Sequence, residues 1–236
     1  MTREQLIGLS LYYKGEYFEI QKALKERKTV DLHEEVNAIT ILDSTYPEKL
    51  FDLKYPPYVL FYKGDISLLN KECVSVVGSR NPCDYALKAT EGLCQKMDKV
   101  VVSGLAKGID ACAHLNSRDT IGILGCGIDY IYPYANLKLI KDIEKRGLII
   151  SEYPHLSEPL NYHFPFRNRI IAALSDCMYI MQCKDKSGTM TSVNEALSLG
   201  KEIRVLPYDI FDDNGVQNNL LIYEGATPIR KEEIAF

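Results

Sequence analysis

The chain has 236 residues, of which 46% are hydrophobic and 25% are charged. This composition excludes a disordered protein and fits one sizeable α/β domain, or one such domain with a small appendage. The formal net charge of −4 excludes a strongly basic protein, so any site for a polyanion must be a local patch.

Membrane, secreted and metal-binding classes are also disfavoured. No apolar run reaches the length of a membrane span, and residues 1–5 lack the pattern of a secretory signal, so we expect a cytoplasmic protein without a membrane partner. The seven cysteines and four histidines show no C-x-x-C or H-x-x-x-H spacing. We therefore expect reduced thiols and no metal.

The predicted elements begin with a small helical segment over residues 1–38. Apolar residues around Leu9 and Ile20 form two faces, and Gly15 separates them. The segment is too short for a core of its own, so we expect it to pack on the main domain, which comprises residues 39–236.

The next elements are two strands at 38–42 and 58–62, followed by two successive strand–turn–helix units. In the first unit, residues 73–77 form an apolar run that ends in a turn at Gly78, and a helix follows over 85–97. In the second unit, the apolar run 100–102 leads into a turn at Gly104. Such units are typical of parallel strands.

The second half of the chain continues the alternation of strands and helices, with a long loop between residues 153 and 165. We predict strands over residues 120–124, 148–150, 177–182 and 203–206, and helices over residues 137–146, 170–174 and 192–199. This order predicts an α/β fold with a doubly wound, mostly parallel sheet.

Glycine-rich turns follow four of the predicted strands, at Gly78, Gly104, Gly125 and Gly188. The carboxyl ends of parallel strands share one rim of the sheet, where ligands bind. Glycine lets backbone N–H groups approach an anion, and a helix start adds positive potential. Cationic and hydroxyl side chains accompany these turns: Arg80, Lys107, Lys186, Ser79, Ser187, Thr189 and Thr191. The sequence therefore predicts a phosphate site.

None of these turns is a cofactor motif. They match neither the P-loop pattern G-x-x-x-x-G-K-[ST] nor the dinucleotide pattern G-x-G-x-x-G. We therefore expect no cofactor.

Aromatic residues beside cations extend the phosphate prediction to a polynucleotide. The segment after residue 152 carries Tyr153, Tyr162, His163, Phe164 and Phe166, followed by Arg167 and Arg169. Aromatic faces next to cations suit single-stranded nucleic acid, in which unpaired bases stack and phosphates pair with the cations. The alternative is that these rings pack their own segment onto the sheet.

Signals for catalysis are weak. No nucleophile elbow with Ser, His and Asp is present. Asp110, Glu152 and Glu195 are candidate acids, and we interpret Asp110 with His114, which have the i,i+4 spacing of a helix, mainly as a structural hydrogen-bonded pair. We expect a protein that is not an enzyme.

The sequence resembles the DNA-processing protein A family (DprA/Smf). The resemblance is carried, in the family's order, by Val76–Arg80, Val102–Asp110 with Ala113–His114, Gly125–Asp129 with Tyr132–Pro133 and Asn136, Ser151–Glu152, Phe164–Ile171, Ser187–Thr189 and Gly225–Ala226. It covers roughly residues 46 to 230. The chain resembles a short form, without the C-terminal winged-helix-like domain that many members carry.

The resemblance implies an extended Rossmann-like domain that binds single-stranded DNA, dimerises, and loads the RecA recombinase onto incoming DNA, which it protects, during natural transformation. It implies a phosphate pocket formed by Gly78, Ser79, Arg80, Gly104, Lys107, Ser187, Gly188 and Thr189. Base and backbone contacts would come from the segment of Phe164, Phe166, Arg167 and Asn168. For the dimer interface, the sequence offers only an apolar stretch at Leu220, Leu221 and Ile222.

A rival prediction is a Rossmann-like nucleotide-binding protein or a nucleoside-monophosphate phosphoribohydrolase. Such enzymes also place a Gly/Thr-rich turn before a helix that bears a glutamate. Here the turn at Gly188 and the later Glu195 imitate that pattern, without its double glycine. The salt dependence of binding distinguishes a site for single-stranded DNA from a site for a mononucleotide, because binding across several phosphates weakens steeply with salt.

Overall fold

The computed structural model describes residues 1–31, 34–185 and 187–235. The helices are α1 (Arg3–Tyr12), α2 (Tyr17–Lys25), α3 (Asp84–Lys96), α4 (Ile109–Asn116), α5 (Leu137–Arg146), α6 (His163–Leu174), α7 (Gly188–Ser198) and α8 (Val216–Tyr223). The strands are β1 (Ala38–Thr40), β2 (Val59–Gly64), β3 (Cys73–Gly78), β4 (Val100–Ser103), β5 (Thr120–Ile123), β6 (Leu148–Ser151), β7 (Cys177–Gln182), β8 (Glu202–Val205) and β9 (Thr227–Pro228).

Within these residues, nine strands form one sheet in the order β1-β2-β6-β5-β4-β3-β7-β8-β9. The strands from β6 through β9 in that order pair in parallel, whereas β1, β2 and β6 pair antiparallel to one another. The predicted α/β class with a doubly wound, mostly parallel sheet is therefore confirmed.

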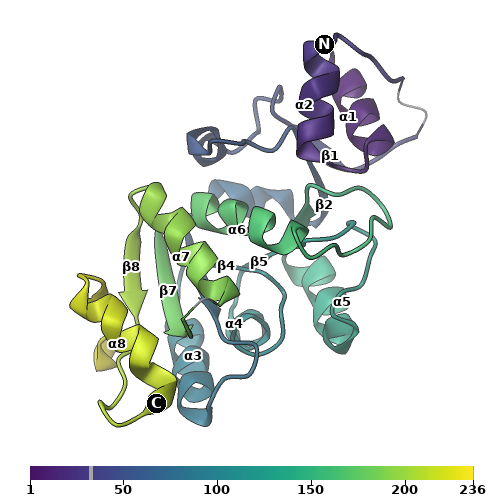
Figure 1. The fold of residues 1–236 in the computed structure, drawn as a ribbon. Helices are drawn as coiled ribbons and strands as arrows, with labels where there is room; N and C mark the ends of the chain where they lie inside the picture. Colours follow the sequence, from purple (N-terminus) through teal and green to yellow (C-terminus); the bar gives the residue numbers. More distant parts are fainter. Residues whose placement is uncertain (32–33, 186, 236) are drawn as a thin grey trace.

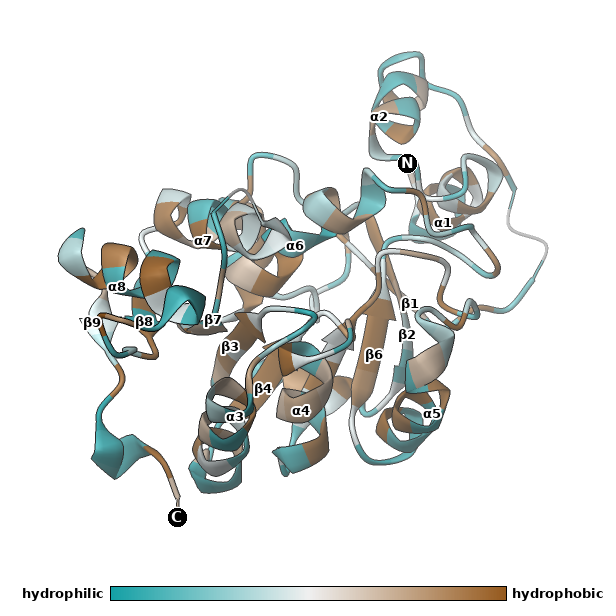
Figure 2. Ribbon diagram, turned by 60° about the horizontal axis from the view of Figure 1, so that its bottom comes forward, coloured by the Kyte–Doolittle hydropathy of each residue, from teal (hydrophilic) through white to brown (hydrophobic). Residues whose placement is uncertain are grey.

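Helices cover both faces of the sheet, which is why its central strands are apolar on both sides. Figure 2 shows this apolar character in β3, β4 and β6. On one face, α3 and α4 contribute Leu93 and Ile109 to a core with Val74 and Val76 of β3. On the other face, Ile170 of α6 and Val193 of α7 share a core with strand residues such as Val102 of β4 and Ile180 of β7.

The order in which the chain adds strands to the sheet switches sides at β3. From β3 it proceeds outward through β4, β5 and β6, and α6 then carries it back to β7, which pairs with the other side of β3. The connections on the two sides of β3 diverge, so a crevice opens at the carboxyl ends of β3 and β7. This switch point is where a doubly wound sheet binds its ligand.

The N-terminal helices pack against one end of the sheet, and α8 lies at the other end (Figure 1). Leu6 and Ile7 of α1 share a core with Val59 and Phe61 of β2. The predicted packing of this segment on the main domain is therefore confirmed, while the boundary at residue 38 stays a prediction.

Two helices begin earlier than the sequence predicts, and two elements were not predicted at all. α6 begins at His163 and α7 at Gly188. In α6, Pro165 lies in the first turn, where its missing N–H is tolerated. The unpredicted elements are α8 and β9. The helical segment is also shorter than predicted, since α2 ends at Lys25. No described helix combines the length and apolar character needed to cross a membrane.

Candidate functional site

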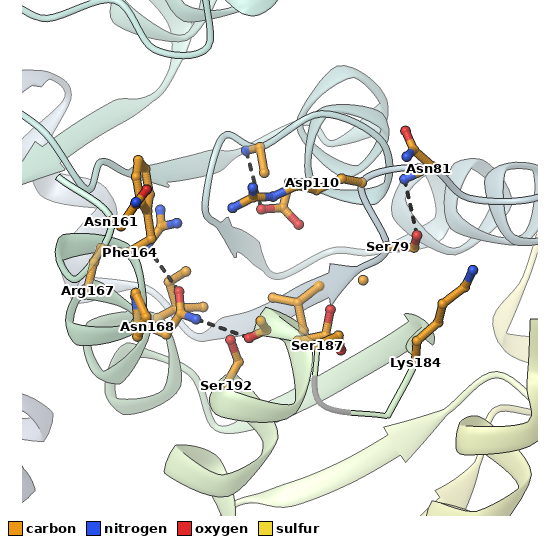
Figure 3. A pocket seen from close by; sticks show the side chains of 18 of the residues that line it. Ser79, Asn81, Asp110, Asn161, Phe164, Arg167, Asn168, Lys184, Ser187 and Ser192 are labelled. Atoms are coloured by element: carbon orange, nitrogen blue, oxygen red, sulfur yellow. Dashed lines mark hydrogen bonds between the residues drawn. The ribbon is translucent and has the colours of Figure 1, made fainter. Parts of the chain in front are cut away.

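A pocket of about 510 Å³ opens at the switch point between β3 and β7. Figure 3 shows that Phe164, Arg167 and Asn168 of α6 lie across the pocket from Ser79 and Asn81, with Ser187 at the start of α7. The polar and charged lining residues are Ser79, Arg80, Asn81, Asp110, Asn161, Arg167, Asn168, Lys184, Ser187, Thr189 and Ser192.

The backbone of the turn after β3 is held by hydrogen bonds, and the side chain of Arg80 projects from it. The backbone N–H of Ser79 donates to Gln182 O at 2.7 Å, and Ser79 Oγ accepts from the N–H of Asn81 at 3.1 Å. Gly78 is needed for packing, because an added Cβ would lie 2.7 Å from Cγ1 of Ile109. Arg80 is exposed and lines the mouth of the pocket. The structure thus places Gly78, Ser79 and Arg80 in the lining of the pocket, and their contact with phosphate stays a prediction.

Of the turn after β4, Ala106 lines the pocket, whereas Gly104 does not. The backbone N–H groups of Gly104 and Ala106 donate to Asp110 Oδ2 at 3.2 and 3.4 Å, so the N–H of Gly104 has an internal partner. Lys107 is exposed but does not line the pocket. Neither Gly104 nor Lys107 is therefore where the phosphate-pocket prediction places it.

Arg167 supplies a buried positive charge to the pocket floor. It is 5% exposed, and its Nη1 donates to Gly104 O at 2.8 Å and to Ile123 O. Gly104 admits the guanidinium, because an added Cβ would lie 2.7 Å from Nη2. Burial lowers the pKa of Arg167 to about 10, with Asp110 opposing that shift, so Arg167 is charged at neutral pH. Burial also raises the pKa of Asp110, and Arg167 opposes that shift.

Phe164 projects from the first turn of α6 into the wall of the pocket. Gly125 makes room for its ring, because an added Cβ there would lie 2.8 Å from Cδ1 of Phe164. The guanidinium carbon of Arg80 lies 6.0 Å from the centre of the same ring. An aromatic face and a cation therefore meet at the mouth of the pocket, which is the pairing that unpaired bases and phosphates require.

Phe166 and Arg169 lie on the opposite side of α6 from Phe164 and do not line the pocket. Arg169 forms a bidentate ion pair with Glu152, both distances being 2.6 Å, and its guanidinium lies 3.7 Å from the centre of the Phe166 ring. Phe166 also contacts the ring of Tyr17 from α2, at 5.8 Å between ring centres. The two residues do not lie beside Phe164, because the segment is a helix and its successive residues face different sides. Their predicted contact with DNA stays a prediction.

The first turn of α7 forms the wall opposite the turn after β3. Ser187 is the N-cap of the helix, and its buried Oγ has no hydrogen-bond partner among the described residues. Gly188 has nothing within 4 Å of an added Cβ, and Thr189 lines the pocket. A helix N-terminus with free donors suits a phosphate. The predicted site residue Lys186 lies outside the described residues.

Several pocket residues were missed or misjudged from the sequence. Lys184, Asn161 and Ser192 line the pocket, and the only available signal was their position next to the predicted turns and loop. Asp110 and His114 do not form the predicted pair: Asp110 turns back to the N–H groups of the β4 turn, whereas Nδ1 of His114 lies 2.6 Å from Thr120 Oγ1. Among the described residues, no group of three or more His, Cys, Asp and Glu side chains is arranged to hold a metal ion.

A doubly wound, mostly parallel sheet with a pocket at its switch point defines the class of this protein as a Rossmann-like α/β protein. Comparison with known proteins then identifies the family. The sequence model of the family "DNA recombination-mediator protein A" matches residues 37–235, and the chain belongs to this family.

Relatives from several bacteria match over most of the chain. DNA processing protein DprA of Bacillus subtilis (strain 168) is 36% identical over 245 residues, which cover 100% of this chain and 82% of that protein. The X-ray structure of DprA from Streptococcus pneumoniae superposes with a TM-score of 0.81 at 35% identity, over 93% of this chain and 80% of that one. A DprA structure from Helicobacter pylori, reported for its single-stranded DNA binding mode, has a TM-score of 0.75 at 36% identity, over 83% and 92% of the two chains.

Proposed function

We propose that this protein binds single-stranded DNA in the pocket between β3 and β7. One observation carries the proposal: the exposed Arg80 and the ring of Phe164 stand together at the mouth of a pocket whose opposite wall is the start of α7. A phosphate placed there would meet the Arg80 guanidinium and the N-terminus of α7, while the adjacent base would lie against Phe164. The Helicobacter pylori relative supports the same ligand class.

The family also supports a proposed role in recombination. In line with the name of the family, we propose that the protein protects incoming DNA and loads a RecA-type recombinase onto it, and that it acts as a cytoplasmic homodimer without enzymatic activity. Of the predicted interface residues, Leu221 belongs to the core at 6% exposure. The exposed face of α8 is formed instead by Val216, Leu220 and Tyr223, which we propose as the dimer contact.

The rival phosphoribohydrolase has less support. That chemistry needs a carboxylate in contact with the substrate. Asp110 is the only acidic residue among the described pocket residues, and one of its oxygens accepts two backbone N–H bonds. Glu195 does not line the pocket.

The test is fluorescence anisotropy with a labelled dT oligonucleotide at two salt concentrations, with unlabelled duplex as competitor. We expect binding that weakens steeply with salt, because each phosphate contact contributes about −0.7 to the slope of log K against log salt for single strands. Duplex should not displace the labelled strand. Absence of binding at low salt would overturn the proposal, and base release from nucleoside monophosphates would then be assayed.

A further inference from the structure

The pocket wall beside Phe164 carries a second aromatic ring. Tyr132 lies in the loop after β5, lines the pocket and is 39% exposed. The centres of the Tyr132 and Phe164 rings are 5.3 Å apart, and their planes are inclined by 38°. Within the described part of the chain, the Tyr132 hydroxyl has no hydrogen-bond partner, so the ring is not placed there to satisfy a structural bond.

The loop that presents Tyr132 is fixed at both ends. Asn136 Nδ2 donates to Leu105 O at 2.9 Å and to Ala106 O at 3.1 Å, which ties the loop to the turn after β4. At the other end, Cys126 Sγ donates to Tyr130 O at 3.6 Å. A ring on a fixed backbone loses little conformational entropy when a ligand covers it, so its exposed face is preorganised for binding.

The spacing of the two rings excludes one mode of binding and favours another. A base inserted between them would need two stacking distances of about 3.4 Å each, or roughly 7 Å in total. The observed 5.3 Å is too short for that, so Phe164 and Tyr132 cannot clamp a single base between them. They form instead a continuous ledge of two inclined faces along the pocket wall.

We propose that this two-ring ledge, Phe164 with Tyr132, stacks the bases of two neighbouring nucleotides, which makes Tyr132 a DNA-contacting residue. The proposal rests on the proposed function, since it extends the strand from the Phe164 face to the next base. Both faces require bases that are not covered by a duplex partner, so the ledge also contributes to the preference for single strands.

The absence of tryptophan from the sequence allows a direct test. Tyr132→Trp introduces a single indole whose fluorescence reports stacking on a base. We expect oligo-dT to quench it, and to leave the emission of Tyr134→Trp unchanged. Tyr134 is the matched control, because it is 75% exposed, belongs to the same loop and does not line the pocket.

Affinity measurements separate a ring contact from a structural effect. We expect Tyr132→Ala to weaken oligo-dT binding about tenfold and Tyr132→Phe to leave it unchanged, because the ring and not the hydroxyl makes the contact. On an abasic oligonucleotide, Tyr132→Ala and wild type should bind equally. A loss that persists on the abasic strand would assign Tyr132 to support of the loop and overturn the ledge.

The two proposals fail in different ways. If wild type binds no oligo-dT, the proposed function fails and the ledge with it. If wild type binds oligo-dT while Tyr132→Ala binds equally well and Tyr132→Trp is not quenched, only the ledge is overturned.

Discussion

Arg80 and Arg167 both line the pocket, yet their surroundings give them different tasks. Arg80 is exposed, and its described contact is with the face of Phe164. Arg167 is buried, and its guanidinium is engaged with the carbonyl groups of Gly104 and Ile123. Arg80 is therefore the cation available to an incoming phosphate, whereas the buried Arg167 contributes a positive electrostatic potential at the bottom of the pocket.

Arg80→Ala tests this division. We expect at least a tenfold loss of single-strand affinity, because a charge-assisted contact is worth about 1.5–3 kcal/mol, and a salt slope that is smaller by about 0.7. The melting temperature should not change, because the side chain is exposed. Arg118→Ala is the matched control, since Arg118 is exposed and precedes β5 at the opposite rim of the sheet. Equal binding by both variants would contradict the pocket assignment.

His114 is buried in its neutral form. Thr120 Oγ1 donates its one hydrogen to Val101 O, so Nδ1–H of His114 must donate to Thr120, and Nε2 is left without a partner. Protonation would place a positive charge in this buried site, near the positive charges of Arg146 and Arg167. Burial accordingly lowers the pKa of His114 to about 3, from an ordinary value near 6.5.

This shift predicts a pH dependence of stability. Below pH 6.5 the unfolded chain takes up a proton on His114 that the folded protein does not accept until about pH 3, so stability falls as the pH falls through this range. Between pH 7 and pH 5 the loss from this group is about 2 kcal/mol. Urea unfolding should show a weaker pH dependence in His114→Asn than in wild type. Parallel curves for His114→Asn and wild type would contradict the assignment.

At the scale of single residues, the sequence indicates which residues belong to the candidate site better than it indicates their contacts. The glycines of the turns, Arg80 and Phe164 were predictable because glycine spacing and aromatic–cation neighbours are local signals. That Gly104 N–H binds Asp110 was not predictable, because the contact depends on how the β4 turn folds back on α4.

Helix α6 is the element that connects the pocket with the N-terminal helices. One side of the helix faces the pocket with Phe164, Arg167 and Asn168. On the other side, His163 is hydrogen-bonded to Glu16, and Arg169 forms an ion pair with Glu152. The first two turns of α6 therefore have a pocket side and a structural side.

A pair of phenylalanine substitutions distinguishes the two sides. We expect Phe164→Ala to cost about 1–3 kcal/mol of binding to oligo-dT with little change in stability. Phe166→Ala should instead lower the free energy of unfolding by about 2 kcal/mol, since its half-buried ring loses its contacts with Arg169 and Tyr17. Anisotropy and urea unfolding on both variants provide the check. A binding defect for Phe166→Ala at full stability would contradict the two-sided helix.

The strands were the more predictable elements. Buried parallel strands are apolar runs, and β3 and β4 each lead directly into a glycine, Gly78 or Gly104. The start of α6 was not recognisable, because Pro165 and the rings around it disguise the helical period, and α8 lacks a strong one-sided pattern in Val216–Tyr223.

For the whole molecule, the exposed face of α8 is the surface that we propose for self-association. On α8, Val216, Leu220 and Tyr223 are 63%, 43% and 89% exposed, at the spacing of one helix face. An exposed apolar face of this kind is typical of an interaction site.

We predict that Leu220→Glu converts a dimer into a monomer, because the carboxylate would be buried in the contact. Leu115→Glu is the control, since Leu115 is 63% exposed on α4, away from α8. Sedimentation velocity provides the measurement. A Leu220→Glu variant that sediments like wild type would exclude this face as the contact.

The edges of the sheet have a consequence for how copies of this protein behave when crowded on one strand of DNA. β1 is three residues long, and its Ala38 O and Thr40 N–H are occupied by the side chains of Arg3 and Asp43. At the far edge, β9 is two residues long and ends in Pro228, which has no N–H to donate. Neither edge offers a template for another strand, so neighbouring copies have no route to backbone pairing. We therefore expect their assemblies on DNA to come apart when the DNA is removed, instead of growing into β-aggregates.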